Sequence, residues 1–198
     1  MSFYPDIAEY VPRDTSRHVE NIFLIDRSFS MTQGSAPPLE DLKRTMQMIV
    51  QNLRGTSQFN FIDFGSSHWR LFERCANVND DNRVKAWQHI QSIKGNHGGT
   101  FLFDALKSVF LLADRTPLGD RKVLRNVFVL SDGHVADPDS TLELIKKNAA
   151  YTRVFTFGIG ESCNRHFIQA MARLVRFLFT CCNFLKNKKT DRLLFFLF

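Results

Sequence analysis

The chain has 198 residues, of which 44% are hydrophobic and 23% charged, as expected for one globular domain with a sizeable core and a short appendage. The formal net charge is +6, but five Lys or Arg residues and a single acidic residue lie after residue 174, so most of this charge belongs to the last segment. The preceding residues show no basic stripe and no known nucleic-acid motif, which excludes nucleic acid as the expected partner.

Apolar runs of strand length alternate with longer amphipathic stretches along the chain. Residues 21–26 read Asn-Ile-Phe-Leu-Ile-Asp, and this continuous apolar run predicts a buried strand. Residues 37–54 carry apolar side chains at helical spacing, with a proline near the start and a glycine just past the end, which predicts a helix. The other predicted elements, in chain order, are strands at 58–64 and 68–72, helices at 80–93 and 101–113, a strand at 126–131, a helix at 138–149, a strand at 153–158 and a helix at 164–174.

This alternation predicts an α/β fold, doubly wound around a mostly parallel central sheet with helices on both faces. The short pair at 58–72, parted by a Gly-Ser-Ser turn, supplies the expected antiparallel edge strand. In open sheets of this kind, ligands bind beyond the carboxyl ends of the strands. A functional site is therefore expected in the loops that follow residues 25 and 130.

Oxygen-bearing side chains gather in three loops at that edge. The first predicted strand ends in Asp26, and Ser28 and Ser30 follow it. Asp132 follows the strand at 126–131, and Thr100 follows a glycine-rich loop just before a helix. Two carboxylates and three hydroxyls suit Mg²⁺ or Mn²⁺ and are poor ligands for zinc. Taken singly, each residue is more commonly a helix cap or a turn residue, but their joint occurrence at strand ends favours a bound divalent cation.

These five residues, in this order, resemble the metal-ion-dependent adhesion site of von Willebrand factor A domains. The surrounding sequence is similar to the von Willebrand factor A domain-containing protein 5 group, which is related to inter-alpha-trypsin inhibitor heavy chains. The similarity runs from about residue 2 to residue 174, and the segments that carry it are 22–31, 59–67, 98–100, 127–133 and 155–161.

The resemblance implies a six-stranded sheet flanked by helices, with a cation at its top edge. It implies that the hydroxyls of Ser28, Ser30 and Thr100 bind the cation, and that Asp26 and Asp132 bind it directly or through water. A carboxylate of a protein partner is then expected to complete the coordination of the ion. It also implies three segments: a linker at 1–18 that follows an upstream VIT-like domain outside this chain, a von Willebrand factor A domain at 19–174, and a divergent tail at 175–198.

Phe29 departs from the resemblance, because the residue between the two serines is usually small in the family. Its ring either narrows the approach of a partner, makes an apolar contact beside the ion, or packs on a neighbouring loop. His97 and His134 lie in loops near the proposed ion. We expect these three residues to contact the partner, and the histidines to be exposed loop residues rather than catalytic bases.

The segment 175–198 departs more strongly, with six of the chain's 20 Phe and a cluster of lysines. Such a shift resembles sequence read past an exon boundary or from a truncated gene model. The adjacent cysteines at 181 and 182 leave open a lipidated membrane anchor, although the apolar run is too short to span a bilayer. Residues 175–179 can also pair in the position of the last strand, because their alternation permits it.

Catalysis has no supporting constellation in the sequence. Phosphatases with an aspartyl nucleophile carry a second Asp two residues on, where this chain has Ser28. No phosphate-binding loop or nucleophile elbow is present, and the six histidines lack metal-ligand spacing. We therefore expect a monomeric, non-enzymatic module that binds an acidic protein partner through the metal. The alternative is a scaffold domain whose contacts do not depend on the metal.

The setting is expected to be cytoplasmic rather than extracellular. Residues 1–11 do not show the pattern of a secretory signal. The four cysteines show neither the spacing of a disulfide framework nor that of a zinc site. We expect no transmembrane segment.

Overall fold

The computed structural model describes residues 18–35, 37–111, 123–150, 152–174 and 179–182. Its strands form one sheet in the order β3-β2-β1-β5-β6-β7, and β4 pairs with β2 off this path. The strands are β1 (His18–Asp26), β2 (Gln58–Phe64), β3 (His68–Arg70), β4 (Ala76–Asn77), β5 (Val123–Ser131), β6 (Arg153–Ile159) and β7 (Phe179–Cys182). The helices are η2 (Phe29–Thr32), α1 (Pro38–Asn52), α2 (Asp80–Ser92), α3 (Leu102–Leu111), α4 (Pro138–Asn148) and α5 (Arg165–Leu174).

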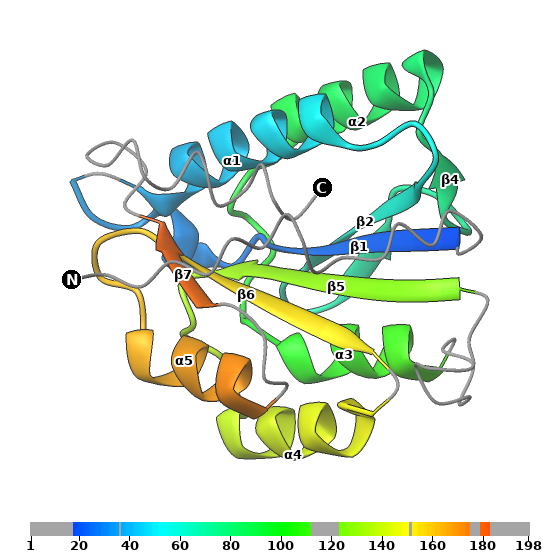
Figure 1. The fold of residues 1–198 in the computed structure, drawn as a ribbon. Helices are drawn as coiled ribbons and strands as arrows, with labels where there is room; N and C mark the ends of the chain where they lie inside the picture. The colour runs from blue at the N-terminus through cyan, green and yellow to red at the C-terminus, as the bar shows by residue number, and fades with distance from the viewer. Residues whose placement is uncertain (1–17, 36, 112–122, 151, 175–178, 183–198) are drawn as a thin grey trace, which may run out of the picture.

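Helices cover both faces of the sheet, with α1 and α2 on one side and α3, α4 and α5 on the other (Figure 1). The central strands are apolar on both faces for this reason. In β1, Phe23 and Ile25 pack into the core beneath α1 and α2, while Ile22 and Leu24 pack into the core beneath the other three helices. The continuous apolar run at 21–26 is thus explained by burial from two directions.

The parallel strands β1, β2, β5 and β6 all end at one edge of the sheet. In Figure 1 this edge lies on the left, where β1 passes into the short η2 turn. The loops after β1 and β5 are neighbours there, because these two strands pair directly along eight residues. The sheet therefore brings the predicted ligand loops together.

The predicted α/β fold is confirmed, with two additions. The turn of 3-10 helix η2 and the two-residue strand β4 were not predicted, since both are too short to produce a periodic pattern. The path of six strands agrees with the sheet implied by the resemblance, and β4 adds a second antiparallel neighbour of β2. Strand β5 begins three residues earlier than predicted, at Val123.

The last strand position is occupied by β7, which pairs in parallel with β6. The stretch proposed for that position, 175–179, shares only its final residue with β7, and 175–178 lie outside the described residues. So do the predicted linker up to residue 17, the last two residues of the helix predicted at 101–113, and the tail from 183 onward. Among the described residues, no helix combines the length and apolar character needed to cross a bilayer.

Candidate metal centre

The loop after β1 folds its polar side chains onto one another. Asp26 is fully buried, and its Oδ1 accepts hydrogen bonds from the Ser28 amide at 2.9 Å and from the Ser28 hydroxyl at 2.5 Å. The hydroxyl oxygens of Ser28 and Ser30 lie 2.9 Å apart. Ser28 is the N-cap residue of η2, and Ser30 lies within that turn. The tight turn, rather than an extended strand, brings the two serines together.

Strand β5 completes the surroundings of Asp26 from the other side. The Ser131 hydroxyl donates to Asp26 Oδ2 at 2.5 Å and accepts from the Gly133 amide at 2.9 Å. The next residue, Asp132, is 3% exposed, and its Oδ1 accepts from the His134 amide at 3.0 Å. Asp26 and Asp132 thus lie at the ends of neighbouring strands, each held by bonds within its own loop and joined through Ser131.

The third loop carries Thr100 and is bonded to its neighbours mainly through its main chain. The His97 amide donates to the Arg27 carbonyl, and the Gly98 carbonyl accepts from the Phe29 amide at 3.0 Å. Gly98 has a φ of +71°, a conformation that favours glycine. The Thr100 carbonyl accepts from the amide of Ala136, which lies in the loop after β5. Thr100 is buried and is therefore fixed between the loops of the two aspartates.

The candidate site carries negative charge without a basic counterpart. Burial raises the pKa of Asp26 to about 6; hydrogen bonds from Ser131 and Ser28 oppose this rise, and the charge of Asp132 adds to it. No ion pair joins either aspartate to a Lys, Arg or His within the described ranges. A cluster of three or more His, Cys, Asp or Glu that could hold a metal is also absent from the described part of the chain. The proposed set contains only two residues of these types, because its other three ligands are hydroxyl groups. Carboxylate and hydroxyl oxygens fit a hard cation.

The three predicted partner contacts lie around these loops. The Phe29 ring is 63% exposed, so it projects to the surface beside the buried ligands rather than packing inside. His134 is exposed, and its Nε2 lies 3.1 Å from the Ser162 carbonyl. The His97 ring packs edge-on against Trp69, with centroids 4.4 Å apart. Partial burial, followed by the charge of Arg27, lowers the pKa of His97.

Three residues of this region were missed by the sequence reasoning. Ser131 lies in the strand predicted at 126–131, but its hydrogen bond to Asp26 was not predicted. Arg27 pairs with Asp63 of β2, at 2.6 Å between Nη1 and Oδ2. The signal for Asp63 was present, because a charged residue inside the apolar strand 58–64 needs a partner.

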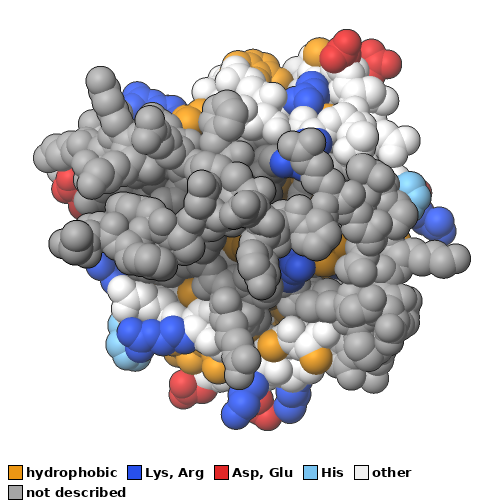
Figure 2. All heavy atoms as spheres, viewed as in Figure 1, with side chains coloured by type: hydrophobic (Ala, Val, Ile, Leu, Met, Phe, Trp, Pro, Cys, Tyr) orange, Lys and Arg blue, Asp and Glu red, His pale blue; other side chains and the backbone are white. Residues whose placement is uncertain are grey.

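Charged side chains are dispersed on one face of the described residues. On the face shown in Figure 2, the described Lys and Arg side chains lie at separate places with Asp and Glu among them. They do not gather into one patch on this face of the described residues.

Comparisons with known proteins agree with the fold. A family model described as von Willebrand factor type A domain matches residues 20–181. The human von Willebrand factor A domain-containing protein 5B1 is 34% identical over 172 residues, which cover 87% of this chain and 13% of that protein. The chain thus spans a small part of the length of such relatives.

Solved structures share the fold at low sequence identity. The manganese-loaded TRAP protein of Plasmodium vivax aligns with a TM-score of 0.63 and 20% identity, covering 80% of this chain and 63% of that one. The proximal thread matrix protein 1 of the mussel byssus, with a zinc-occupied MIDAS motif, aligns with a TM-score of 0.62 and 19% identity, covering 93% and 46%. At these identities the likeness concerns the fold alone.

Proposed function

The chain belongs to the von Willebrand factor type A domain family, and we propose that it binds a protein partner through a divalent cation at the carboxyl edge of its sheet. The proposed ligands of this cation are Asp26, Ser28, Ser30, Thr100 and Asp132. The partner would offer a carboxylate to the cation.

The observation that carries this proposal is a pair of buried carboxylates, Asp26 and Asp132, without a basic partner among the described residues. Burying a charge without a counter-charge costs free energy, so such a pair is stable only if it is protonated, rearranged or bound to a cation. The pKa of Asp26, at about 6, leaves it largely ionised at neutral pH. A divalent cation would offset both charges.

The chemistry of the set favours Mg²⁺ or Mn²⁺. All five side chains offer oxygen, which these ions prefer, while zinc favours nitrogen and sulfur. Of the two structural neighbours, one is manganese-loaded and the other has a zinc-occupied motif, which supports a divalent cation on this fold without choosing the ion. When bound, the cation would supply Lewis acidity that attracts an anionic group of the partner. The chain's own residues orient that group and exclude bulk water from the buried aspartates.

The exposed Phe29 ring would add an apolar contact to this recognition. Its amide is anchored to Gly98, so the ring is held beside the metal loops while its side chain stays open to solvent. We propose that the partner presents an acidic residue next to an apolar one, with His97 and His134 at the rim of the contact.

Calorimetric titration of Mg²⁺ and Mn²⁺ into the 198-residue chain tests the metal site. The wild type should bind each ion at one site, and Asp132→Ala should lose most of that affinity because one of two buried carboxylates is gone. An Asp137→Ala variant is the matched control, since Asp137 caps α4 through the Ser140 amide and is exposed. Identical titration curves for the wild type and Asp132→Ala would contradict the proposal.

A metal-independent scaffold is the second candidate function, favoured by α2. Val84 and Trp87 lie three residues apart on this helix and are 55% and 38% exposed. Contacts made by this face would survive chelation of the metal. Once a partner is identified, its binding is measured in EDTA and to the Val84→Ser and Trp87→Ser variants. A scaffold contact survives EDTA and weakens in these variants, because it depends on α2. A metal-dependent contact is lost in EDTA and is unchanged in the variants.

A further inference from the structure

We propose that Arg27, Asp63 and His89 form a positioning network that sets the affinity of the candidate site for its cation without touching the cation. The inference rests on the proposed metal-binding function and extends it to residues outside the ligand set. It states that the network holds the loop of Thr100 in register with the loop of Asp26.

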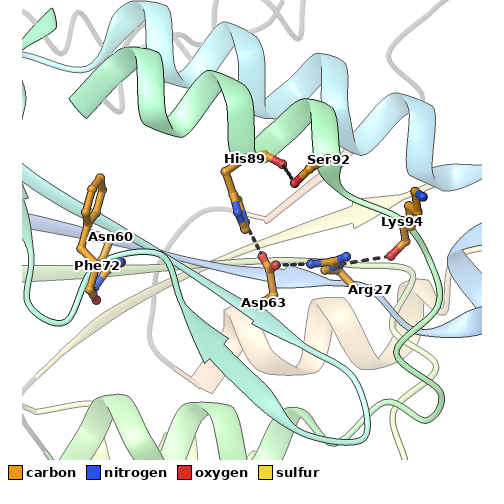
Figure 3. Close-up of polar contacts among 7 residues, drawn as sticks. All are labelled: Arg27, Asn60, Asp63, Phe72, His89, Ser92 and Lys94. Atoms are coloured by element: carbon orange, nitrogen blue, oxygen red, sulfur yellow. Dashed lines mark hydrogen bonds and ion pairs between the residues drawn. The ribbon is translucent and has the colours of Figure 1, made fainter. Parts of the chain in front are cut away.

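The network is a buried carboxylate held from two sides (Figure 3). Asp63 Oδ2 pairs with Arg27 Nη1 at 2.6 Å, and Asp63 Oδ1 lies 3.0 Å from His89 Nε2. The side chain of Asp63 is 3% exposed, and those of Arg27 and His89 are 13% and 18% exposed. Both oxygens of the carboxylate are therefore engaged, and little of the network reaches solvent.

The position of Asp63 in β2 is unusual for a charged residue. Its neighbours on the same face of the strand, Phe59 and Phe61, belong to the apolar core beneath α1 and α2. A carboxylate on that face costs free energy unless it is paired and hydrogen-bonded, and breaking one side of such a pair is strongly destabilising. An apolar residue of similar size would stabilise the fold as well as this ion pair does. The place of the pair in the fold therefore suggests a second role.

That location is the metal loop itself. Arg27 stands in the sequence between two proposed ligands, Asp26 and Ser28, and its guanidinium lies between the Asp63 carboxylate and the Lys94 carbonyl (Figure 3). Its Nε donates to the Lys94 carbonyl at 3.1 Å. Lys94 begins the glycine-rich segment that leads to Thr100. One guanidinium thus connects the β1 loop, strand β2 and the start of the Thr100 loop.

The other bonds between these two loops are made by the main chain. The His97 amide donates to the Arg27 carbonyl, and the Phe29 amide donates to the Gly98 carbonyl. Both lie farther along the loop than Lys94. Among the described residues, the Arg27 guanidinium makes the side-chain hydrogen bond that fixes the start of the loop to the β1 turn. Its loss would leave the loop attached but free to shift at one end.

His89 connects the end of α2 to the same carboxylate, Asp63. It lies in the last turn of the helix, where the Ser92 hydroxyl donates to its carbonyl at 2.7 Å. The contact between His89 and Asp63 holds this end of α2 against β2, and Lys94 follows two residues after the helix ends. The helix end, the strand and the metal loop are therefore fixed by one carboxylate.

The test compares Arg27→Met with Arg125→Met, a variant that breaks a similar ion pair elsewhere in the sheet. Glu20 and Arg125 form a similar ion pair at 2.7 Å, with side chains 17% and 14% exposed. Both lie near the amino-terminal ends of β1 and β5, at the edge of the sheet away from the metal loops. Mn²⁺ affinity of the full chain is measured by calorimetry, and stability by urea unfolding in EDTA. We expect Arg27→Met to lower Mn²⁺ affinity about 10- to 100-fold, the range for residues that support metal ligands. Arg125→Met should lower stability and leave Mn²⁺ affinity within about twofold, because a pair remote from the metal loops cannot shift them.

Two further variants keep the test decisive if Arg27→Met does not fold. Arg27→Lys keeps the positive charge beside Asp63 but lacks the planar guanidinium group that also reaches Lys94. The Mn²⁺ affinity of this variant should therefore fall severalfold. In a cycle with Asp63→Asn, the double variant should lose no more affinity than Arg27→Met or Arg27→Lys alone.

The possible failures can be told apart. If the wild type binds Mn²⁺ and both Arg27 variants bind it equally well, the positioning network is wrong while the metal site stands. If Arg125→Met weakens binding as much as Arg27→Met, the effect reflects general destabilisation, which also overturns the inference. If the wild type does not bind Mn²⁺, the proposed function itself fails.

Discussion

The Ser131 hydroxyl donates a 2.5 Å hydrogen bond to Asp26 Oδ2 and so joins the ends of the two central strands, β5 and β1. This bond ties the Asp26 carboxylate to the residue that precedes Asp132. It lowers the pKa of Asp26 against the larger opposing effect of burial. Ser131 therefore keeps a buried carboxylate ionised where a cation is proposed to bind.

Removal of this bond should reduce both stability and metal affinity. In Ser131→Ala, Asp26 Oδ2 stays buried but loses its donor, which costs about 1–3 kcal/mol in the free energy of unfolding. Urea unfolding in EDTA measures this cost. Ser108→Ala is the control, because that hydroxyl bonds only the Ala105 carbonyl within α3, and it should change stability by less than about 1 kcal/mol. Equal effects of the two substitutions would contradict the role of Ser131.

The metal-free domain should lose stability as the pH rises towards neutrality. The pKa of Asp26 is about 6 in the folded chain and 3.8 ordinarily, so the folded state holds more protons between these values. Stability from this group is fully present below pH 3.8 and is lost as pH rises through about 6, amounting to about 3 kcal/mol. Unfolding in EDTA at several pH values, compared between wild type and Asp26→Asn, isolates this contribution. A difference between the two proteins that does not vary with pH would contradict it.

Metal affinity should depend on pH in the opposite direction. A divalent cation binds the ionised carboxylate, so protons compete with it once the pH falls below about 6. Mn²⁺ affinity should fall about tenfold for each pH unit below that point and level off above it. Calorimetry between pH 5 and pH 8 checks this, and a flat affinity down to pH 5 would show that Asp26 is not a ligand.

Phe29 should be neutral for folding and for the metal. Because its ring is 63% exposed, Phe29→Ala should change the free energy of unfolding by less than about 0.5 kcal/mol and leave Mn²⁺ affinity unchanged. Phe23→Ala is the contrast, since that ring is fully buried and its loss costs about 3–5 kcal/mol. A large loss of stability in Phe29→Ala would mean that the ring packs on the protein and is not offered to a partner.

Gly98 should be required for the geometry of the Thr100 loop. Its φ of +71° strains any L side chain, and an added Cβ would meet the Ser66 hydroxyl, which also accepts from the Gly99 amide. Gly98→Ala should therefore lose about 1–2 kcal/mol of stability and weaken Mn²⁺ binding. Gly55→Ala is the control, because nothing lies within 4 Å of its added Cβ. Equal metal affinity in the two variants would contradict the need for glycine at position 98.

The sequence predicted the elements that depend on long apolar patterns. Burial from both faces leaves a continuous apolar run in β1, and the helices show their apolar spacing, so the α/β sheet and the position of its ligand edge followed directly. The proposed ligands could be selected because each follows a strand or a glycine-rich loop. The bounds of most elements agree with the structure to within a few residues.

The remaining features of the site depend on contacts that the apolar pattern of the sequence does not predict. The approach of Ser30 to Ser28 comes from a single 3-10 turn, too short to give a period. The pairing of Arg27 with Asp63 joins residues 36 positions apart and depends on the register of β1 with β2. The contact of Trp69 with His97 likewise requires β3 to lie beside the glycine-rich loop. Such distant pairs become visible only when the sheet is assembled.

The most direct test of a cation held by this edge of the sheet is a crystal of the chain grown with Mn²⁺ and measured for its anomalous signal. We predict one strong anomalous peak within bonding distance of the Ser28 and Ser30 hydroxyls, with the carboxylates of Asp26 and Asp132 around it. An ordered site without a peak at saturating Mn²⁺, or a peak bound elsewhere on the chain, would contradict the account.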